Sequence, residues 1–424
     1  MSTAAEFLKR HGMEPEKVEP ARDAWKMKDE MERGLAGEGG SLAMIPTYLS
    51  DDGAIPLDKP VVVIDAGGTN FRKALITFDD SGYKVDGLSK WKMPGIDRPA
   101  TWEEFISFTA NAIISLMDKT HKVGFCFSFS ADITPEIDGR VQRIDKEVVI
   151  TGCEDQLVAA SLKAELERRG VFGTKIVILN DTVAVLLGGL AAVRRSDYSG
   201  FVGQVSGTGT NTCCSLPARR IGKLGLDSDR SMIVNLESGM YDGIRGGDFD
   251  RLLDERSHNP GEKHFEKLTA GVYLGELCHT MLRAAADEGL LSPQASERVR
   301  AMGWIDSAVI DAWACGERLE QICETKEDEA FTEEICRAMF ARSARCMCTN
   351  LAAILLLTGA GANGGKPACI CAEGSLVQKG RAYRPVLEQL IRDEIGGKLG
   401  INAEFRVGSE TTLPGSAAAA LLNT

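Results

Sequence analysis

The sequence lacks the features by which several large classes of protein are recognised. No block of lysine and arginine offsets a formal net charge of −12, which argues against a nucleic-acid partner. The longest apolar run, Leu351 to Leu357, is far shorter than the roughly 20 residues of a membrane-spanning helix. We therefore expect a soluble protein that handles a small ligand, with no nucleic-acid partner and no membrane partner.

The twelve cysteines lack the spacing of a zinc site. No CxxC pair occurs, and the five histidines lie far from zinc-site spacing. The close pairs are Cys213-Cys214, Cys346-x-Cys348 and Cys369-x-Cys371. Because no signal peptide precedes them, we expect reduced, buried cysteines in a cytoplasmic enzyme.

Strand-like and helix-like segments alternate along the chain, which predicts an α/β fold. Strands are expected at 61–64, 122–129, 175–179, 232–236, 368–372 and 403–407, and helices at 15–35, 101–119, 154–169, 182–195, 264–288 and 383–396. The segment 130–135 is expected to be a loop. The length of 424 residues fits two or three domains of roughly 100–200 residues each, and no linker separates independent domains.

The chain is organised around Val61 to Phe78, a glycine turn between two strand-like runs. Asp65 ends the first run, and Lys73 to Phe78 has the pattern of a second strand. Because no helix follows the turn, this stretch lacks the order of a Walker loop or of a dinucleotide fingerprint. Its glycines still let backbone N–H groups approach phosphate oxygens, and Asp65 is placed to hold a magnesium ion through water. A plain hairpin turn is the structural alternative.

A second stretch, Phe201 to Ser215, repeats this design with the turn Gly-Thr-Gly-Thr-Asn. Two glycine hairpins about 140 positions apart predict two similar halves that face one nucleotide, an architecture that resembles the actin-like ATPases. A third glycine turn, Glu373-Gly374-Ser375, follows another expected strand and suits the adenosine end of a nucleotide. Together the three turns favour a kinase.

Polar side chains at the ends of expected strands are candidates for chemistry. Asp181 follows the strand at 175–179, where open α/β sheets place their ligands. A carboxylate there can accept the proton of a substrate hydroxyl during phosphoryl transfer, whereas an N-cap aspartate is the structural alternative. Asn180 and Glu237 also lie just past strands, where ordinary turn formers are common, and Lys146 is a lone basic residue in a loop.

Several segments resemble the hexokinase family, in the family's order. They are EMERGLAGEGGSLAMIPTYL, DAGGTNFR, GFCFSFS, LNDTVAVLLGG, GTGTN and NPGEKHFEKLTAGVYLGEL, followed by AEGSLVQKG and SETTLPGSAAAALL. The resemblance implies two actin-like (ribonuclease-H-like) lobes with a central ligand cleft. It implies a small lobe of residues 60–181 with 408–424, and a large lobe of residues 1–59 with 182–407.

The resemblance also implies a role for each matched residue. The catalytic residues are Asp181, as general base, and Lys146. The expected hexose ligands are Ser128, Asp145, Asn180, Asn211, Glu237 and Glu266. The expected ligands of ATP are Asp65, Gly67, Gly68, Thr69, Asn70, Arg72, Gly207, Thr208, Gly209, Thr210, Gly374 and Ser375, with Asp65 on the side of Mg²⁺. The implied reaction is transfer of the γ-phosphoryl group of MgATP to the 6-hydroxyl of a hexose, with glucose as the expected substrate.

Three departures from the family's pattern bear on the choice of sugar. Ser130 replaces a proline, Ser238 replaces a tryptophan, and Asp145-Lys146-Glu147-Val148 stands where the family usually has Thr-Lys-Gly-Phe. The added carboxylate of Asp145 suits sugar hydroxyls that donate to it, and it could equally attract a protonated amine, which would favour glucosamine. A side chain that points to solvent from a shifted loop is the structural alternative. A kinase of mannose, fructose or glucosamine and a non-catalytic sugar sensor therefore stay open as alternatives. A homodimer is left open as well.

Overall fold

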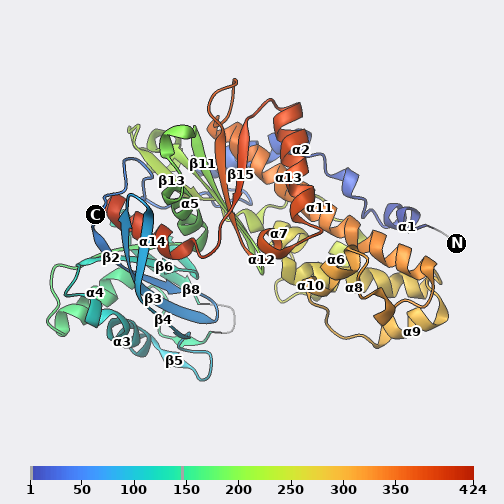
Figure 1. The fold of residues 1–424 in the computed structure, drawn as a ribbon, viewed down its shortest axis with the longest axis horizontal. Helices are drawn as coiled ribbons and strands as arrows, with labels where there is room; N and C mark the ends of the chain where they lie inside the picture. The colour runs from blue at the N-terminus through green and yellow to red at the C-terminus, as the bar shows by residue number, and fades with distance from the viewer. Residues whose placement is uncertain (1–2, 145–147) are drawn as a thin grey trace. The chain divides into compact units, whose positions relative to one another are not determined.

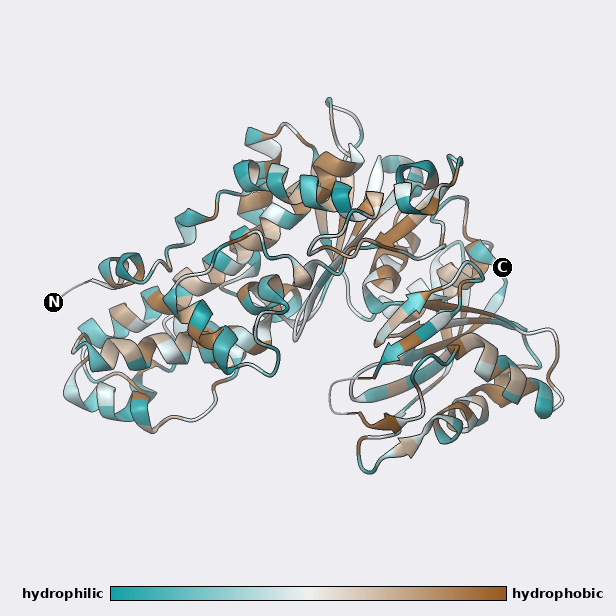
Figure 2. Cartoon of the chain, turned by 180° about the vertical axis from the view of Figure 1, so that it is seen from behind, coloured by the Kyte–Doolittle hydropathy of each residue, from teal (hydrophilic) through white to brown (hydrophobic). Residues whose placement is uncertain are grey.

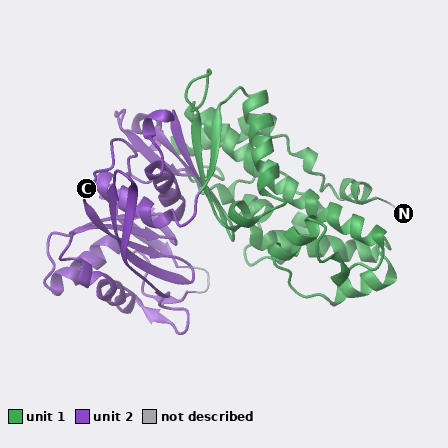
Figure 3. Ribbon diagram, viewed as in Figure 1, with its two compact units in different colours: residues 1–43, 205–212, 237–407 green, residues 44–204, 213–236, 408–424 purple. Residues whose placement is uncertain are grey.

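The computed structural model describes residues 3–144 and 148–424 (Figure 1). The chain forms two compact units (Figure 3). Unit 1 comprises Met1–Ala43, Val205–Thr212 and Glu237–Val407, and unit 2 comprises Met44–Gln204, Cys213–Leu236 and Gly408–Thr424. Residues 60–181 and 408–424 thus share one unit, while the boundaries of the two expected lobes stay a prediction.

Unit 2 is built on a five-stranded sheet with the order β10-β6-β2-β3-β4. Its strands are β2 (Pro60–Ala66), β3 (Asn70–Asp79), β4 (Gly82–Lys92), β6 (Lys122–Phe127) and β10 (Lys175–Leu179). β2 runs parallel to β6, which runs parallel to β10, and β2, β3 and β4 form an antiparallel meander. The expected glycine hairpin is therefore confirmed, because β3 and not a helix follows the turn after β2.

Both faces of this sheet are covered, which explains why its central strands are almost entirely apolar. One face packs on α3 (Trp102–Ile113) and α4 (Val158–Arg168) in a single apolar cluster. α14 (Thr412–Asn423) contacts β2, β6, β10 and α5 (Asp181–Ala191). Helices of unit 2 carry both polar and apolar residues, as their mixed colouring shows (Figure 2).

Glycines let α14 approach its neighbours closely. A Cβ on Gly124 of β6 would lie 2.0 Å from the Ser416 carbonyl oxygen, and a Cβ on Gly415 would lie 1.9 Å from the Ala184 carbonyl oxygen. No side chain fits in either gap. The C-terminal helix is thereby fixed against β6 and against α5, the helix that begins at Asp181.

The expected loop at 130–135 is wrong in its first four residues. β7 (Ser130–Ile133) pairs antiparallel with β8 (Gly139–Arg143), and a short turn joins the two strands. β5 (Ala100–Thr101) pairs with β9 (Ile150–Thr151) in a further small sheet. The local sequence does not predict β7, because it is a strand only through its pairing with β8. That partner lies beyond Pro135.

Several expected helices have other bounds in the structure. α2 (Pro20–Ala36) begins at Pro20 instead of residue 15, and α3 ends at Ile113 instead of residue 119. Two further differences have a clear physical cause. α4 begins at Val158 instead of residue 154, because the carboxylate of Asp138 accepts hydrogen bonds from the first-turn N–H groups of Ala159 and Ala160 at 2.6 and 2.9 Å. The expected helix at 264–288 is divided at Ala270, whose extended backbone separates α7 (His264–Thr269) from α8 (Gly271–Asp287).

A six-stranded sheet has the order β1-β13-β12-β11-β14-β15. β1 (Ile45–Pro46) and β13 (Ser231–Asn235) belong to unit 2, β14 (Ala368–Glu373) and β15 (Ala403–Val407) belong to unit 1, and β11 (Gly200–Ser206) and β12 (Thr210–Pro217) have residues in each unit. β11 and β12 form the second glycine hairpin, as expected. The alternation of helices and strands confirms the α/β class.

Unit 1 is packed around α11 (Lys326–Thr358), which contacts α1, α2, α7, α8, α10 and α13. Its other helices are α1 (Ala4–Arg10), α2 (Pro20–Ala36), α6 (Asp248–Arg256), α9 (Pro293–Ala301), α10 (Ser307–Ala314), α12 (Ser375–Lys379) and α13 (Arg384–Leu390), continued by a π-helical segment at Ile391–Lys398. One face of α2 is buried, and it is formed by Ala24, Met27, Met31 and Leu35.

α11 is long and apolar enough, by length and composition, to cross a membrane. However, 83% of its apolar window is buried inside the protein, so packing in the core of unit 1 accounts for its composition. All twelve cysteines are free thiols, and all except the half-buried Cys315 are buried. The expectation of buried cysteines is confirmed for eleven of the twelve.

Candidate functional site

Predicted site residues of unit 2 gather at one edge of its sheet. In the ladder of three parallel strands, Asp65 lies opposite Cys126, and Cys126 lies opposite Leu179. Parallel strands end at the same edge of a sheet, which is where open α/β sheets place their ligands. The residues at or just past these strand ends are Asp65, Gly67, Gly68, Thr69, Asn70, Ser128, Asn180 and Asp181.

Asp65 is a buried carboxylate held by Arg72 from the neighbouring strand. Nε and Nη2 of Arg72 donate hydrogen bonds to Oδ2 of Asp65 at 2.9 and 2.5 Å, and Nη2 also donates to the Thr412 hydroxyl at 3.0 Å. Burial raises the pKa of Asp65, Arg72 opposes this shift, and the carboxylate of Asp181 adds to it. Arg72 is thus the counter-ion of Asp65, and its contact with phosphate stays a prediction.

The carboxylates at this edge fit a magnesium ion. Among the described residues, no group of three or more His, Cys, Asp or Glu side chains gathers as a metal site. Mg²⁺ is usually held by only one or two carboxylates together with substrate phosphates, so it needs no larger protein cage. A cation beside Asp65 would also offset the repulsion between Asp65 and Asp181.

The N-cap of the helix that begins at Asp181 is not Asp181 itself. Asn180 is the N-cap of α5, because its Oδ1 accepts a hydrogen bond from the Thr182 N–H at 2.9 Å. Oδ1 of Asp181 accepts from the same N–H at 2.7 Å and from the Thr182 hydroxyl at 3.2 Å. Oδ2 of Asp181 has no hydrogen-bond partner in the part of the chain that the structure describes, so it is available to a substrate hydroxyl.

The first glycine turn leaves space beside its backbone. A Cβ on Gly67 would meet only the Asn70 carbonyl oxygen, at an ordinary 3.6 Å, and the φ angle of Gly67 is not positive. Neither packing nor backbone conformation therefore requires glycine at this position. The missing Cβ keeps the backbone open to a ligand, which is what binding of phosphate oxygens needs.

In unit 1, the second and third glycine turns lie in direct contact. A Cβ on Gly374, whose φ is +119°, would lie 2.2 Å from the Ser206 carbonyl oxygen, and a Cβ on Gly207 would lie 3.2 Å from the Ser375 backbone nitrogen. The Gly271 N–H, at the start of α8, donates to the Gly207 carbonyl oxygen at 2.8 Å. Residues predicted for the phosphates and for adenosine are thus brought together.

The side chains predicted to bind sugar from unit 1 form a connected cluster around the second turn. Nδ2 of Asn211 lies 3.4 Å from Oε1 of Glu237, and Oδ1 of Asn211 accepts from the Ser238 N–H at 3.2 Å. Oε2 of Glu266 accepts a hydrogen bond from the Thr210 N–H at 3.2 Å. A Cβ on Gly209 would lie 3.0 Å from Oε2 of Glu266, so the turn lies directly against this carboxylate.

Glu237 adopts a left-handed backbone conformation, with φ 55° and ψ 46°. This conformation is unfavourable for a residue with a Cβ and is concentrated at functional sites. The next residue, Ser238, is fully buried, and its hydroxyl has no hydrogen-bond partner. The position where the family has tryptophan is thus a packed interior site in this chain.

The structure describes only some of the remaining residues of interest. Asp145 and Lys146 lie outside the described residues, so their roles stay predictions. Ser130, the third departure, is exposed on β7. The sequence analysis did not single out Cys126, whose buried thiol lies 3.7 Å from the Ser128 hydroxyl and beside Asp65. The register of β2 on β6 would have revealed it, because Cys126 is the partner of Asp65.

Comparisons with known proteins agree with this geometry. Two family models, both described as hexokinase, match residues 201–422 and 3–190. The chain is 27% identical to hexokinase-1 of Nicotiana tabacum, over 100% of this chain and 91% of that protein. It is also 27% identical to hexokinase-1 of Saccharomyces cerevisiae, over 87% of this chain and 81% of that protein.

A solved structure shows the same fold. The hexokinase from Schistosoma mansoni, complexed with glucose, superposes with a TM-score of 0.79 at 20% identity. The superposition covers 99% of this chain and 100% of that chain.

Proposed function

The chain belongs to the hexokinase family, and we propose that it transfers the γ-phosphoryl group of MgATP to the 6-hydroxyl of glucose, with Asp181 as general base. The observation that carries the proposal is the hydrogen bonding of the Asp181 carboxylate. Asn180 caps α5, and one carboxylate oxygen of Asp181 has no hydrogen-bond partner among the described residues. A carboxylate at the end of a sheet strand with a free oxygen is suited to accept a hydroxyl proton.

Each unit supplies its own groups for this reaction. In unit 2, Asp181 accepts the proton of the hydroxyl while the open backbone at Gly67 binds phosphate oxygens. Asp65 is the residue that would hold Mg²⁺, which neutralises developing charge on the phosphates when it is bound. The pair of Asp65 with Arg72 keeps the Asp65 carboxylate at a fixed place on the sheet edge.

The side chains of unit 1 that are predicted to bind sugar support a hexose as the phosphoryl acceptor. Glu237 and Glu266 are carboxylates that accept hydrogen bonds from sugar hydroxyls, and Asn211 both donates and accepts. Asn211 and Glu237 orient one another, and the Thr210 N–H orients Glu266. A non-catalytic sensor would need these groups, but it would not need an unengaged general base or the glycine turns.

The test is a coupled assay of ADP release with glucose, mannose, fructose, glucosamine and no sugar. We expect Mg²⁺-dependent release that requires sugar, with the highest kcat/KM for glucose. A higher kcat/KM for glucosamine would replace glucose by an amino-sugar as main substrate. Binding of glucose, measured by calorimetry, without any ADP release would contradict the proposal and support the sensor.

A further inference from the structure

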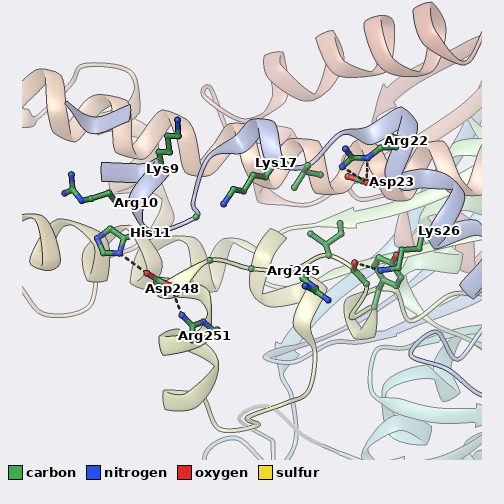
Figure 4. A pocket seen from close by; sticks show the side chains of 17 residues that line it. Lys9, Arg10, His11, Lys17, Arg22, Asp23, Lys26, Arg245, Asp248 and Arg251 are labelled. Atoms are coloured by element: carbon green, nitrogen blue, oxygen red, sulfur yellow. Dashed lines mark hydrogen bonds and ion pairs between the residues drawn. The ribbon is translucent and has the colours of Figure 1, made fainter. Parts of the chain in front are cut away.

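A recess in unit 1 is lined by none of the residues predicted to bind sugar or nucleotide. Its volume is about 660 Å³, and its walls come from the end of α1, the segment between α1 and α2, the start of α2, and the loop at 241–247 with the start of α6 (Figure 4). This volume lies within the usual range for small-molecule sites, roughly 300–1,000 Å³.

The walls of this recess carry an excess of positive charge. Its cationic lining residues are Lys9, Arg10, Lys17, Arg22, Lys26, Arg245 and Arg251, against the carboxylates of Asp23 and Asp248. The chain as a whole carries a net charge of −12, so this local excess runs opposite to the composition. Cations that line a concave site raise the local concentration of anions.

Some of these charges are already neutralised, and others are not. Carboxylates pair with Arg10, Lys17, Arg22 and Arg251. In the described part of the chain, by contrast, Lys9, Lys26 and Arg245 have no carboxylate partner. Lys26 donates only to the Gly243 carbonyl oxygen, at 3.2 Å. The recess therefore retains uncompensated cations from three separate segments.

The loop that carries Arg245 is anchored by close packing. A Cβ on Gly247 would lie 2.5 Å from the His11 carbonyl oxygen, and the Asp248 N–H donates to this same oxygen at 2.9 Å. The carboxylate of Asp250 accepts from the Gly247 N–H at 2.7 Å and pairs with the buried guanidinium of Arg342 at 2.6 Å through both of its oxygens. The backbone beside Arg245 is therefore held in place.

We propose that this recess binds short soluble oligophosphates, with Lys17, Lys26 and Arg245 as the main contacts. Lys26 and Arg245 are uncompensated, and the ion pair of Lys17 with Glu14 is solvent-exposed on the lysine side, so it competes weakly with an anion. Phosphate chains carry several negative charges, which suits a recess whose cations come from three segments. Arginine and lysine are the preferred side chains for such groups. A concave site of this size favours a free small anion over an extended polyanion. This binding does not depend on the phosphoryl transfer proposed above.

The experiment is calorimetric titration of the full chain with sodium tripolyphosphate, without divalent metal. The pocket variant is Lys17→Ala/Lys26→Ala/Arg245→Ala. The matched control is Lys59→Ala/Lys163→Ala/Lys366→Ala, which removes the same charge from three exposed lysines elsewhere. Thermal unfolding of both variants verifies that they fold.

We expect the pocket variant to lose one binding event, or to bind at least tenfold more weakly, while the control binds as the wild type does. Unchanged binding by the pocket variant would overturn the proposal and assign the anion to the glycine turns. Equal loss in both triple variants would overturn the proposal, because it would show unspecific charge attraction. No binding by the wild type would also overturn it. Because sugar phosphorylation is assayed separately, its failure would leave this result unaffected.

Discussion

Replacing Asp181 separates its proposed role in catalysis from a role in stability. Asp181→Asn keeps an acceptor for the Thr182 N–H but removes the base, and Asp181→Ala removes both. In either variant Asn180 still caps α5 through its 2.9 Å hydrogen bond with the Thr182 N–H. The two variants should therefore fold like the wild type and fail in turnover.

The magnitudes expected for the two effects differ clearly. A positioned general base contributes roughly 10²–10⁴ in rate, which is about 2.7–5.4 kcal/mol of transition-state stabilisation. Asp181→Ala loses two hydrogen bonds from Thr182, but the Thr182 N–H keeps Asn180 as an acceptor, so the net loss is that of one bond, about 0.5–1.5 kcal/mol. Removal of the Asp181 charge also relieves its repulsion with the buried Asp65. The free energy of unfolding should thus change by no more than about 1 kcal/mol.

The assay compares kcat, the affinity for hexose and urea unfolding for these variants and for Asn180→Ala. Loss of the N-cap in Asn180→Ala should lower the free energy of unfolding by about 1 kcal/mol. The affinity of the Asp181 variants for hexose should fall much less than kcat, because the other hydroxyls keep their partners. The reasoning is refuted if the Asp181 variants unfold more easily and turn over at a near-normal rate.

Three further predictions concern the framework that holds the sites. Arg342→Met should lower the free energy of unfolding by about 3–5 kcal/mol in urea titrations, because it leaves the buried Asp250 carboxylate unpaired; a loss under 1 kcal/mol would contradict this. Gly374→Ala should lose about 1–3 kcal/mol and raise the KM for ATP, whereas Gly364→Ala, with positive φ but open space, should leave KM unchanged. Burial raises the pKa of Asp328, but hydrogen bonds from Ser292 and from the backbone at the start of α11 outweigh it and lower that pKa. The stability that Asp328 contributes is therefore present above the unfolded-state pKa of about 3.9 and is lost as pH falls through the lower folded-state pKa. In Asp328→Asn, the free energy of unfolding should fall less steeply as pH is lowered, and an unchanged slope would refute this.

Local patterns in the sequence were sufficient to predict the strands and turns that carry the site. The runs before Asp65 and Asp181 are short, apolar and β-branched, and each is a buried strand in the structure. Residues after parallel strands share an edge, so their grouping in unit 2 follows from strand order. The helix expected from residue 101 also begins there, and Thr101 is its N-cap, with a capping box to Glu104.

Contacts between segments that are distant in the sequence could not be predicted from local sequence patterns. Asp138 starts α4 through hydrogen bonds to residues about twenty positions later, so no window around 154 shows where the helix begins. Arg342 and Asp250 are 92 positions apart, and both have the appearance of solvated charges in the sequence. The cationic recess joins residues 9–26 with residues 241–251. Only the tertiary fold brings these charges together.

The geometry of unit 1 links the predicted sugar and phosphate groups through a few atoms. Glu266 accepts a hydrogen bond from the Thr210 N–H in the second glycine turn. Gly239 packs closely here, because a Cβ on it would lie 3.2 Å from both Glu266 and the Thr210 carbonyl oxygen. Glu237 reaches this cluster only by adopting a left-handed conformation, which costs of order 1–3 kcal/mol. A glycine or asparagine would remove most of that cost, so backbone stability does not account for a glutamate here. Ligand binding by its carboxylate stays a prediction.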